Sequence, residues 1–188
     1  MIKPQDLHSG LNSMVTREMV MKNFTHKVIV IMSSVACYGS AFAATQSTMT
    51  NTVTISSSCS ISTLGFTTTY DPVGINASAG QSAIASVTTT CTLLSQPVVT
   101  LGQGANASAS STDAAPIRRL SNGSTFLNYG LFQDAVHTSI WGNTTTTSPV
   151  AVPATGIATP IIIYANIPSG QAAKASTYTD TVIATVTF

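Results

Sequence analysis

The segment T-V-I-A-T-V-T-F (181–188) closes the sequence and alternates apolar and polar side chains, as a half-buried strand does. One face of this segment carries Val182, Ala184, Val186 and Phe188. Because the sequence stops within the strand, we expect its outer edge to lack a partner from the same chain. An unpaired apolar edge invites aggregation unless something covers it. The sequence therefore predicts a β domain whose last strand needs a partner from elsewhere.

A second alternating segment, M-T-N-T-V-T-I (49–55), precedes the first cysteine of the domain and could supply such a partner. One of its faces carries Met49, Asn51, Val53 and Ile55, and the other carries threonines. Burying the three apolar side chains in a groove would contribute about 1.5–3 kcal/mol each, before ordering costs. Asn51 is the exception, because a polar group that enters a groove must find a hydrogen-bond partner. The pattern alone fits a donated strand, a self-paired first strand and a disordered tail equally well.

The N-terminal region has the three parts of a secretory signal. A positively charged lead (21–27) precedes a ten-residue apolar run (28–37), which is too short to span a bilayer, since spanning takes roughly 20 residues. The sequence A-F-A then predicts cleavage between Ala43 and Ala44, with Ala41 as the second small residue of the site.

Two alternatives concern this leader. Residues 1–20 lie upstream of the signal proper (about 21–43), so we hypothesise that translation begins at Met19 or Met21. Cys37 could instead carry a lipid anchor, but the leucine-like residue expected three positions before it is missing.

Residues 44–188 have the size of a single domain with one core. Their charged side chains are Asp71, Asp113, Arg118, Arg119, Asp134, Lys174 and Asp180, with no glutamate. So sparse a set excludes a basic surface for nucleic acid or anionic membrane. Abundant β-branched residues and a low net charge also argue against intrinsic disorder.

Two cysteines remain after cleavage, Cys59 and Cys91. In an exported protein they predict one disulfide, because the compartments outside the cytosol are oxidising. The alternative is a pair of buried free thiols.

Short strands with period-two alternation recur along the domain, and almost no segment has a helical period. The predicted strands are 83–91, 98–101, 126–133, 161–167 and 178–188, with shorter candidates at 59–61, 64–68, 117–120 and 139–141. We expect loops at 102–116 and 142–159. Seven or more short strands in one domain indicate a β-sandwich.

Residues that could carry out chemistry are scarce. His137 is the single histidine after residue 43, no G-x-S-x-G motif accompanies it, and the acidic residues show no metal-ligand spacing. We therefore predict no enzyme activity, no metal, no cofactor and no small-molecule substrate. Trp141 is interpreted as a core anchor rather than an exposed adhesive aromatic. For Arg118 and Arg119, alternation predicts one solvated side chain and one inter-strand partner.

Several stretches occur together in an order that resembles spore coat protein U-type domains, which include pilins of the archaic (Csu-type) chaperone–usher pathway. The matching stretches are I-S-S-S-C (55–59), T-T-T-C-T (88–92), R-R-L-S-N-G (118–123), L-N-Y-G-L-F-Q-D (127–134), W-G (141–142), Y-A-N-I-P-S-G-Q (164–171) and Y-T-D-T-V-I-A-T-V-T-F (178–188). The resemblance covers nearly all of residues 44–188.

This resemblance implies an all-β fold, an incomplete immunoglobulin-like sandwich that a donor strand from a neighbouring subunit completes. It divides the chain into a leader (1–43), a donor-strand arm (44–56) and a pilin domain (57–188). The implied partners are other pilin subunits, a periplasmic chaperone and an outer-membrane usher. The implied product is a cell-surface pilus for adhesion and biofilm growth. The alternative is a self-contained secreted coat or carbohydrate-binding protein, which predicts a monomer indifferent to loss of residues 44–55.

Overall fold

The computed structural model describes residues 43–188, so the predicted signal and Ala41 lie outside the described residues. Its regular elements are β-strands and two short 3-10 helices. They are β1 (Cys59–Leu64), η1 (Ile75–Ala77), β2 (Gln81–Cys91), β3 (Val98–Leu101), β4 (Arg118–Ser121), β5 (Phe126–Phe132), η2 (Thr145–Thr147), β6 (Thr159–Ile167) and β7 (Ala184–Thr187). None of the helices within residues 43–188 is long and apolar enough to cross a membrane.

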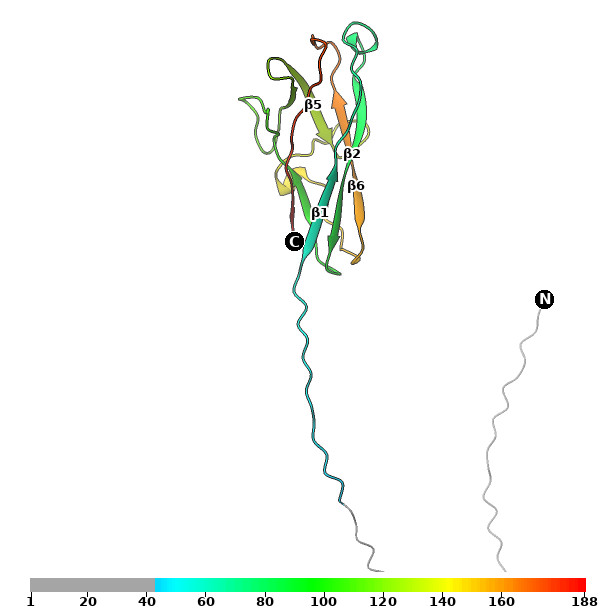
Figure 1. Cartoon of the computed structure of the whole chain (residues 1–188), viewed down its shortest axis with the longest axis vertical. Coiled ribbons are helices and arrows are strands. Elements are labelled where there is room, and N and C mark those ends of the chain that lie inside the picture. The colour runs from blue at the N-terminus through cyan, green and yellow to red at the C-terminus, as the bar shows by residue number, and fades with distance from the viewer. Residues whose placement is uncertain (1–42) are drawn as a thin grey trace, which may run out of the picture. The chain divides into compact units, whose positions relative to one another are not determined.

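The strands form two antiparallel sheets, one in the order β1-β2-β6-β5-β4 and the other pairing β3 with β7. An immunoglobulin sandwich puts strands A, B, E and D in one sheet and C, F and G in the other. Here β1, β2, β6 and β5 take the first four places, and β3 and β7 take those of C and F (Figure 1). No strand of the described residues occupies the place of G. The fold is an immunoglobulin-like sandwich that lacks its last strand.

The core lies between the two sheets and follows the predicted alternation. In β2, the side chains of Ala85, Val87, Thr89 and Cys91 are all buried. In β5, Leu127, Tyr129 and Leu131 point inward as expected. Ile163, Ala165 and Ile167 of β6 fill the space between them.

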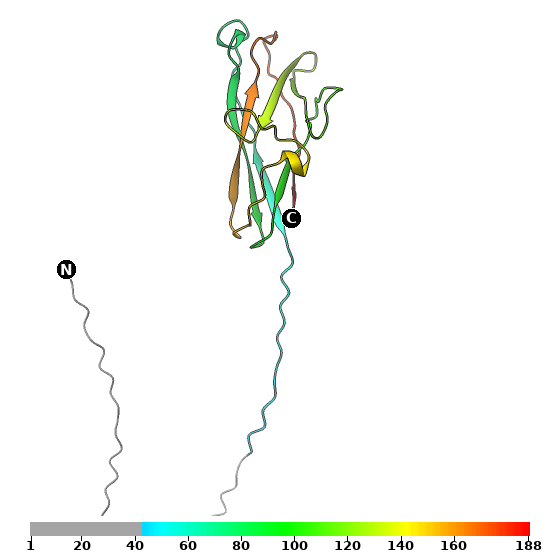
Figure 2. The same ribbon diagram turned by 180° about the vertical axis from the view of Figure 1, so that it is seen from behind.

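Trp141 anchors the end of this core, as its sequence context predicted. Its indole ring is fully buried, and Nε1 donates a hydrogen bond of 2.9 Å to the backbone oxygen of Val99 in β3. Seen from behind, η2 lies beside β3 (Figure 2). The indole therefore ties the two-stranded sheet to the loop that follows β5.

Four segments form less strand than the sequence predicted. Residues 49–55 form none, β1 ends at Leu64 so that 65–68 are unpaired, and β7 begins at Ala184 rather than Tyr178. Residues 139–141 contribute a single bridge between Ile140 and Phe132. All four segments have the same reason. A β-strand requires backbone hydrogen bonds to a neighbouring strand, and these segments have few or no such bonds within the described residues.

Candidate strand-acceptor groove

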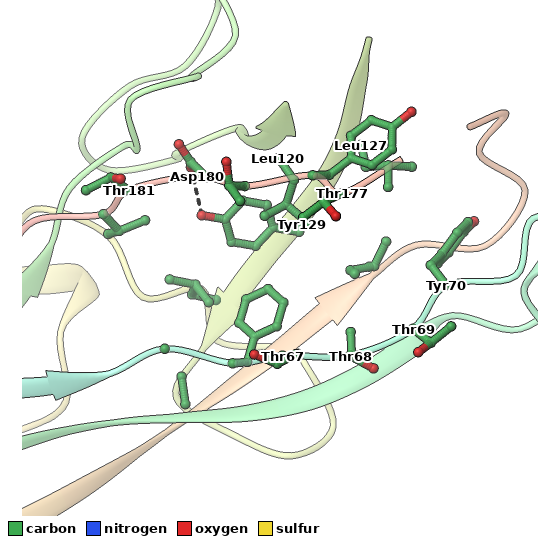
Figure 3. A pocket seen from close by; sticks show the side chains of 18 of the residues that line it. Thr67, Thr68, Thr69, Tyr70, Leu120, Leu127, Tyr129, Thr177, Asp180 and Thr181 are labelled. Atoms are coloured by element: carbon green, nitrogen blue, oxygen red, sulfur yellow. Dashed lines mark hydrogen bonds between the residues drawn. The ribbon is translucent and has the colours of Figure 1, made fainter. Parts of the chain in front are cut away.

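A groove of about 1120 Å³ opens in the sandwich where strand G would lie. One of its walls is formed by residues 63–72, which continue from β1, and the other by residues 173–182, which lead into β7. Figure 3 shows residues 67–70 on one side, with Thr177, Asp180 and Thr181 on the other. From here on, "the groove" means the space between these two walls.

The wall that leads into β7 exposes a row of unused backbone groups. Its odd-numbered residues are bonded on the side away from the groove: Thr179 pairs with Ser121, and the oxygen of Thr181 accepts from the backbone N–H of Ala105. Backbone groups of alternate residues point to opposite edges of a strand. Those of Tyr178, Asp180 and Val182 therefore face the groove, and they have no hydrogen-bond partner within the described residues.

The opposite wall is also extended and unpaired. Within the described residues, the backbone groups of residues 65–70 make no hydrogen bond. Its side chains alternate, with Phe66, Thr68 and Tyr70 half-buried and their neighbours exposed. The ring of Phe66 meets that of Tyr129 edge-on, with 5.7 Å between centroids. The groove thus has an unsatisfied backbone edge on both sides.

The floor of the groove is mainly apolar. It consists of Ala85, Ser86, Leu101, Leu120, Leu127, Tyr129, Leu131, Ile163 and Ile167, most of which belong to the core. An extended segment with apolar side chains on one face could bond to both walls and bury those side chains against this floor.

One polar pair interrupts the apolar lining. The hydroxyl of Tyr129 donates a hydrogen bond of 2.8 Å to Oδ2 of Asp180 (Figure 3). Burial, reinforced by this bond, raises the pKa of the Tyr129 hydroxyl far above its usual range. The phenol therefore keeps its proton and remains a donor to the carboxylate.

Loop residues hold Asp180 in place from the side away from the groove. Its Oδ1 accepts hydrogen bonds from the backbone N–H and the Nδ2 of Asn106. Gly104 has a φ of 89°, and a β-carbon there would collide with Oδ2 of Asp180. Gly104, in the predicted loop at 102–116, thus makes room for the carboxylate.

Arg118 lies fully buried close to this pair. Its Nε and Nη2 donate to the backbone oxygens of Gly102, Leu101 and Trp141. Burial lowers its pKa to about 10, and the nearby Tyr129 and Asp180 partly offset that effect. Arg118 thus remains a cation at neutral pH and binds three backbone carbonyls, of which that of Leu101 belongs to strand β3. Arg119 keeps partial exposure and stacks over Phe126, 4.1 Å from the ring centroid.

The predicted residues of the last strand divide into two groups. Val182 and Ala184 line the groove. Val186 pairs with Val99 in the β3–β7 sheet and packs on the core, and Phe188 is 54% exposed beyond the end of β7. On this side, the groove is therefore lined by residues 173–182 and Ala184, and it does not reach Val186 or Phe188.

The predicted donor residues are exposed and belong to an extended segment. Met49, Val53 and Ile55 are each at least 80% exposed, and Asn51 is exposed as well. Ala43 and Ala44 are also exposed. Three apolar side chains on one face of an extended segment form a surface suited to binding a partner.

A disulfide joins Cys59 to Cys91, as predicted. The two cysteines face each other where β1 begins and β2 ends. Just beyond them, the N–H of Ser58 donates to the hydroxyl of Thr92, and the N–H of Thr92 donates to the oxygen of Ser58. The bridge therefore fixes the point at which the extended segment leaves the sandwich.

His137, which the sequence analysis considered for catalysis, does not line the groove. His137 lies in the loop after β5, where its ring packs edge-on against Phe132. Among residues 43–188, no three His, Cys, Asp or Glu side chains gather where they could hold a metal ion. Sequence reasoning predicted a strand at 64–68 without identifying it as a wall of the groove, and it missed the Tyr129–Asp180 pair. An inward-facing aspartate in an otherwise apolar strand face was the available signal for that pair.

Comparisons with known proteins match the part of the chain that contains the groove. The family model described as Spore Coat Protein U domain matches residues 44–185, which include both the extended N-terminal segment and both walls. "Protein U" of Myxococcus xanthus is 37% identical over 171 residues, covering 85% of this chain and 94% of that protein.

A solved structure shows a weaker likeness. It is the CsuC–CsuE chaperone–tip adhesion subunit pre-assembly complex from archaic chaperone–usher Csu pili of Acinetobacter baumannii. The similarity has a TM-score of 0.46 and 20% identity, and it covers 72% of this chain but only 40% of that one. The family match and the curated relative decide the assignment: this chain belongs to the Spore Coat Protein U domain family.

Proposed function

We propose that this chain is a structural subunit of an exported fibre, in which the arm (residues 44–56) of one copy fills the groove of the next. One observation carries the proposal: the groove stands where the last strand of the sandwich is missing, with unpaired backbone on both walls. A docked strand would bond along that backbone, and each such bond contributes about 0.5–1.5 kcal/mol.

The arm has the pattern that such a groove requires. Met49, Val53 and Ile55 share one face, and they are exposed. A shift of one residue would turn threonines into the groove, so the alternation limits the possible registers. Each subunit carries one arm and one groove, so the contact between copies is head-to-tail, and such a contact builds an open filament when the rotation between subunits does not close a ring.

The resemblance to archaic chaperone–usher pilins suggests how an open groove is managed before assembly. We infer that a periplasmic chaperone covers it first and that an outer-membrane usher exchanges the chaperone for the next subunit's arm. The exported fibre would then serve surface adhesion and biofilm growth. The predicted leader (21–43) supports export by this route.

A self-contained coat or carbohydrate-binding protein is the alternative. A coat role agrees with the description of the matched family, Spore Coat Protein U domain, but leaves the open walls of the groove without a role. In that case the protein would remain a monomer, and the arm could be removed without effect.

Replacing one inward residue of the arm tests the proposal. We expect Val53→Asp to abolish the ladder of oligomers in unboiled periplasmic extracts, because a carboxylate would enter an apolar groove without a partner. The matched control is Thr54→Asp, which puts the same charge on the outer face of the arm and should leave the ladder intact. Normal fibres from Val53→Asp would show that the arm is not donated in this orientation.

A further inference from the structure

The groove holds a half-buried polar pair above its mainly apolar floor, and the arm holds one amide among the apolar side chains of residues 49–55. In the wall that leads into β7, Asp180 is the inward-facing charge, half-buried and bonded to Tyr129. Asp71 and Lys174 also line the groove, but both are exposed. In the arm, Asn51 is the polar member of the apolar face. This inference rests on the proposed function, since it concerns how the arm of a second copy sits in the groove.

We propose that Asn51 of one copy hydrogen-bonds the Tyr129–Asp180 pair of the next, and that this contact sets the register of the docked arm. The pair has unused capacity: Oδ2 of Asp180 accepts a single hydrogen bond, and the hydroxyl of Tyr129 accepts none. The side-chain amide of Asn51 provides two donors. An arm that offered only apolar side chains would seal this pair from water without satisfying it.

The length of the arm's inward face agrees with the length of the groove wall in this register. Neighbouring strands in both sheets are antiparallel, so we place the arm antiparallel to residues 173–184. With Asn51 opposite Asp180, Val53 stands opposite Tyr178 and Ile55 opposite Ser176. On the other side of Asn51, Met49 stands opposite Val182 and Ser47 opposite Ala184. All four of these positions line the groove, so the inward face of the arm is used from end to end.

The two neighbouring registers lose this match. A shift of two residues in one direction sets Val53 against Asp180 and Asn51 against Val182. A shift in the other direction sets Met49 against Asp180. Either shift leaves the polar pair facing an apolar side chain, and the first also leaves the amide of Asn51 without a partner.

Crosslinking of outward-facing residues can read the register directly. Tyr178, Asp180 and Val182 turn their backbone groups into the groove, so they would form the hydrogen-bonded pairs with the arm. Thr181 would then belong to a non-hydrogen-bonded pair, in which side chains come closest. In the proposed register its partner is Thr50, and both residues are exposed threonines. Cysteines at these two positions should therefore join adjacent subunits.

The experiment uses the full chain, exported to the periplasm, in three double variants. Thr50→Cys is combined with Thr181→Cys, Thr179→Cys or Ile183→Cys, and single-cysteine variants set the background. We expect the Thr181 variant alone to give a ladder that survives boiling and collapses with reductant. A boiling-resistant ladder from the Thr179 or Ile183 variant would mean a shifted register and would overturn the inference while leaving strand donation intact. An internal crosslink in a monomer would show that the arm fills its own groove, which also overturns it.

A second set of variants tests whether Asn51 determines the register. Adding Asn51→Leu removes the polar match, so crosslinking should spread from position 181 to 179 or 183. If crosslinking stays confined to position 181, something other than Asn51 sets the register. Failure of the proposed function itself would look different, because unboiled samples of every variant, including wild type, would then show no ladder.

Discussion

Arg118 shows how far a single side chain can depart from its local pattern. Alternation along R-R-L-S (118–121) correctly sets the two arginines on opposite faces, and Arg119 keeps partial exposure. The pattern does not reveal that Arg118 enters the core, because its partners are the backbone oxygens of Leu101, Gly102 and Trp141. Those carbonyls come from distant parts of the chain and meet only after folding. A buried guanidinium can bind three of them because its donors form a rigid fork.

Replacing this arginine should therefore be costly. We expect Arg118→Lys to lower the free energy of unfolding by at least about 3 kcal/mol, since each carbonyl left without a donor costs about 1–3 kcal/mol. The measurement is the urea midpoint of purified protein. Arg119→Lys is the matched control and should cost less than Arg118→Lys, because the carbonyls of Asn106 and Ala107 that Arg119 binds are partly exposed and can bond to water instead. Equal midpoints for the two variants would show that the three carbonyl contacts contribute little.

At the level of strands, the sequence predicted the elements that lie inside the sheets better than those at the groove. The faces of β2 and β5 match their alternation, because both neighbours of each strand come from the same chain. Residues 49–55 and 178–183 alternate just as clearly but form no ladder strand. Alternation reports which side chains prefer burial, whereas a ladder also requires a partner. The segments that alternate without pairing therefore mark where a partner is expected.

The disulfide between β1 and β2 should stabilise the sandwich by restricting the unfolded chain. It closes a loop with a sequence separation of 32, for which the chain-entropy model gives about 3–4 kcal/mol. We expect the free energy of unfolding of the Cys59→Ser/Cys91→Ser double variant to be lower by that amount. The variant should therefore have a lower urea midpoint. Reductant provides the control, because it should bring wild type down to the midpoint of the variant and leave the variant unchanged. An unfolding midpoint insensitive to both treatments would contradict this role.

For the molecule as a whole, the sequence predicted the fold class and the need for a further strand. It did not predict how the groove is built. Of its first wall, the sequence predicted a short strand at 64–68, but alternation does not reveal that the backbone of residues 65–68 is left without a hydrogen-bond partner. The polar pair joins Tyr129 of β5 to Asp180, and only the sandwich brings these residues together. The proposed function depends on the strand that is absent from the described residues.

The most direct measurement compares the exported full chain with a variant in which residue 57 follows the signal directly. Periplasmic extracts of both, with a chaperone co-expressed, would be run on a gel without boiling. Donation of the arm predicts a ladder of oligomers from the full chain and a single folded species, without a ladder, from the variant. A folded monomer from both proteins, or a ladder that survives removal of residues 44–56, would contradict the account.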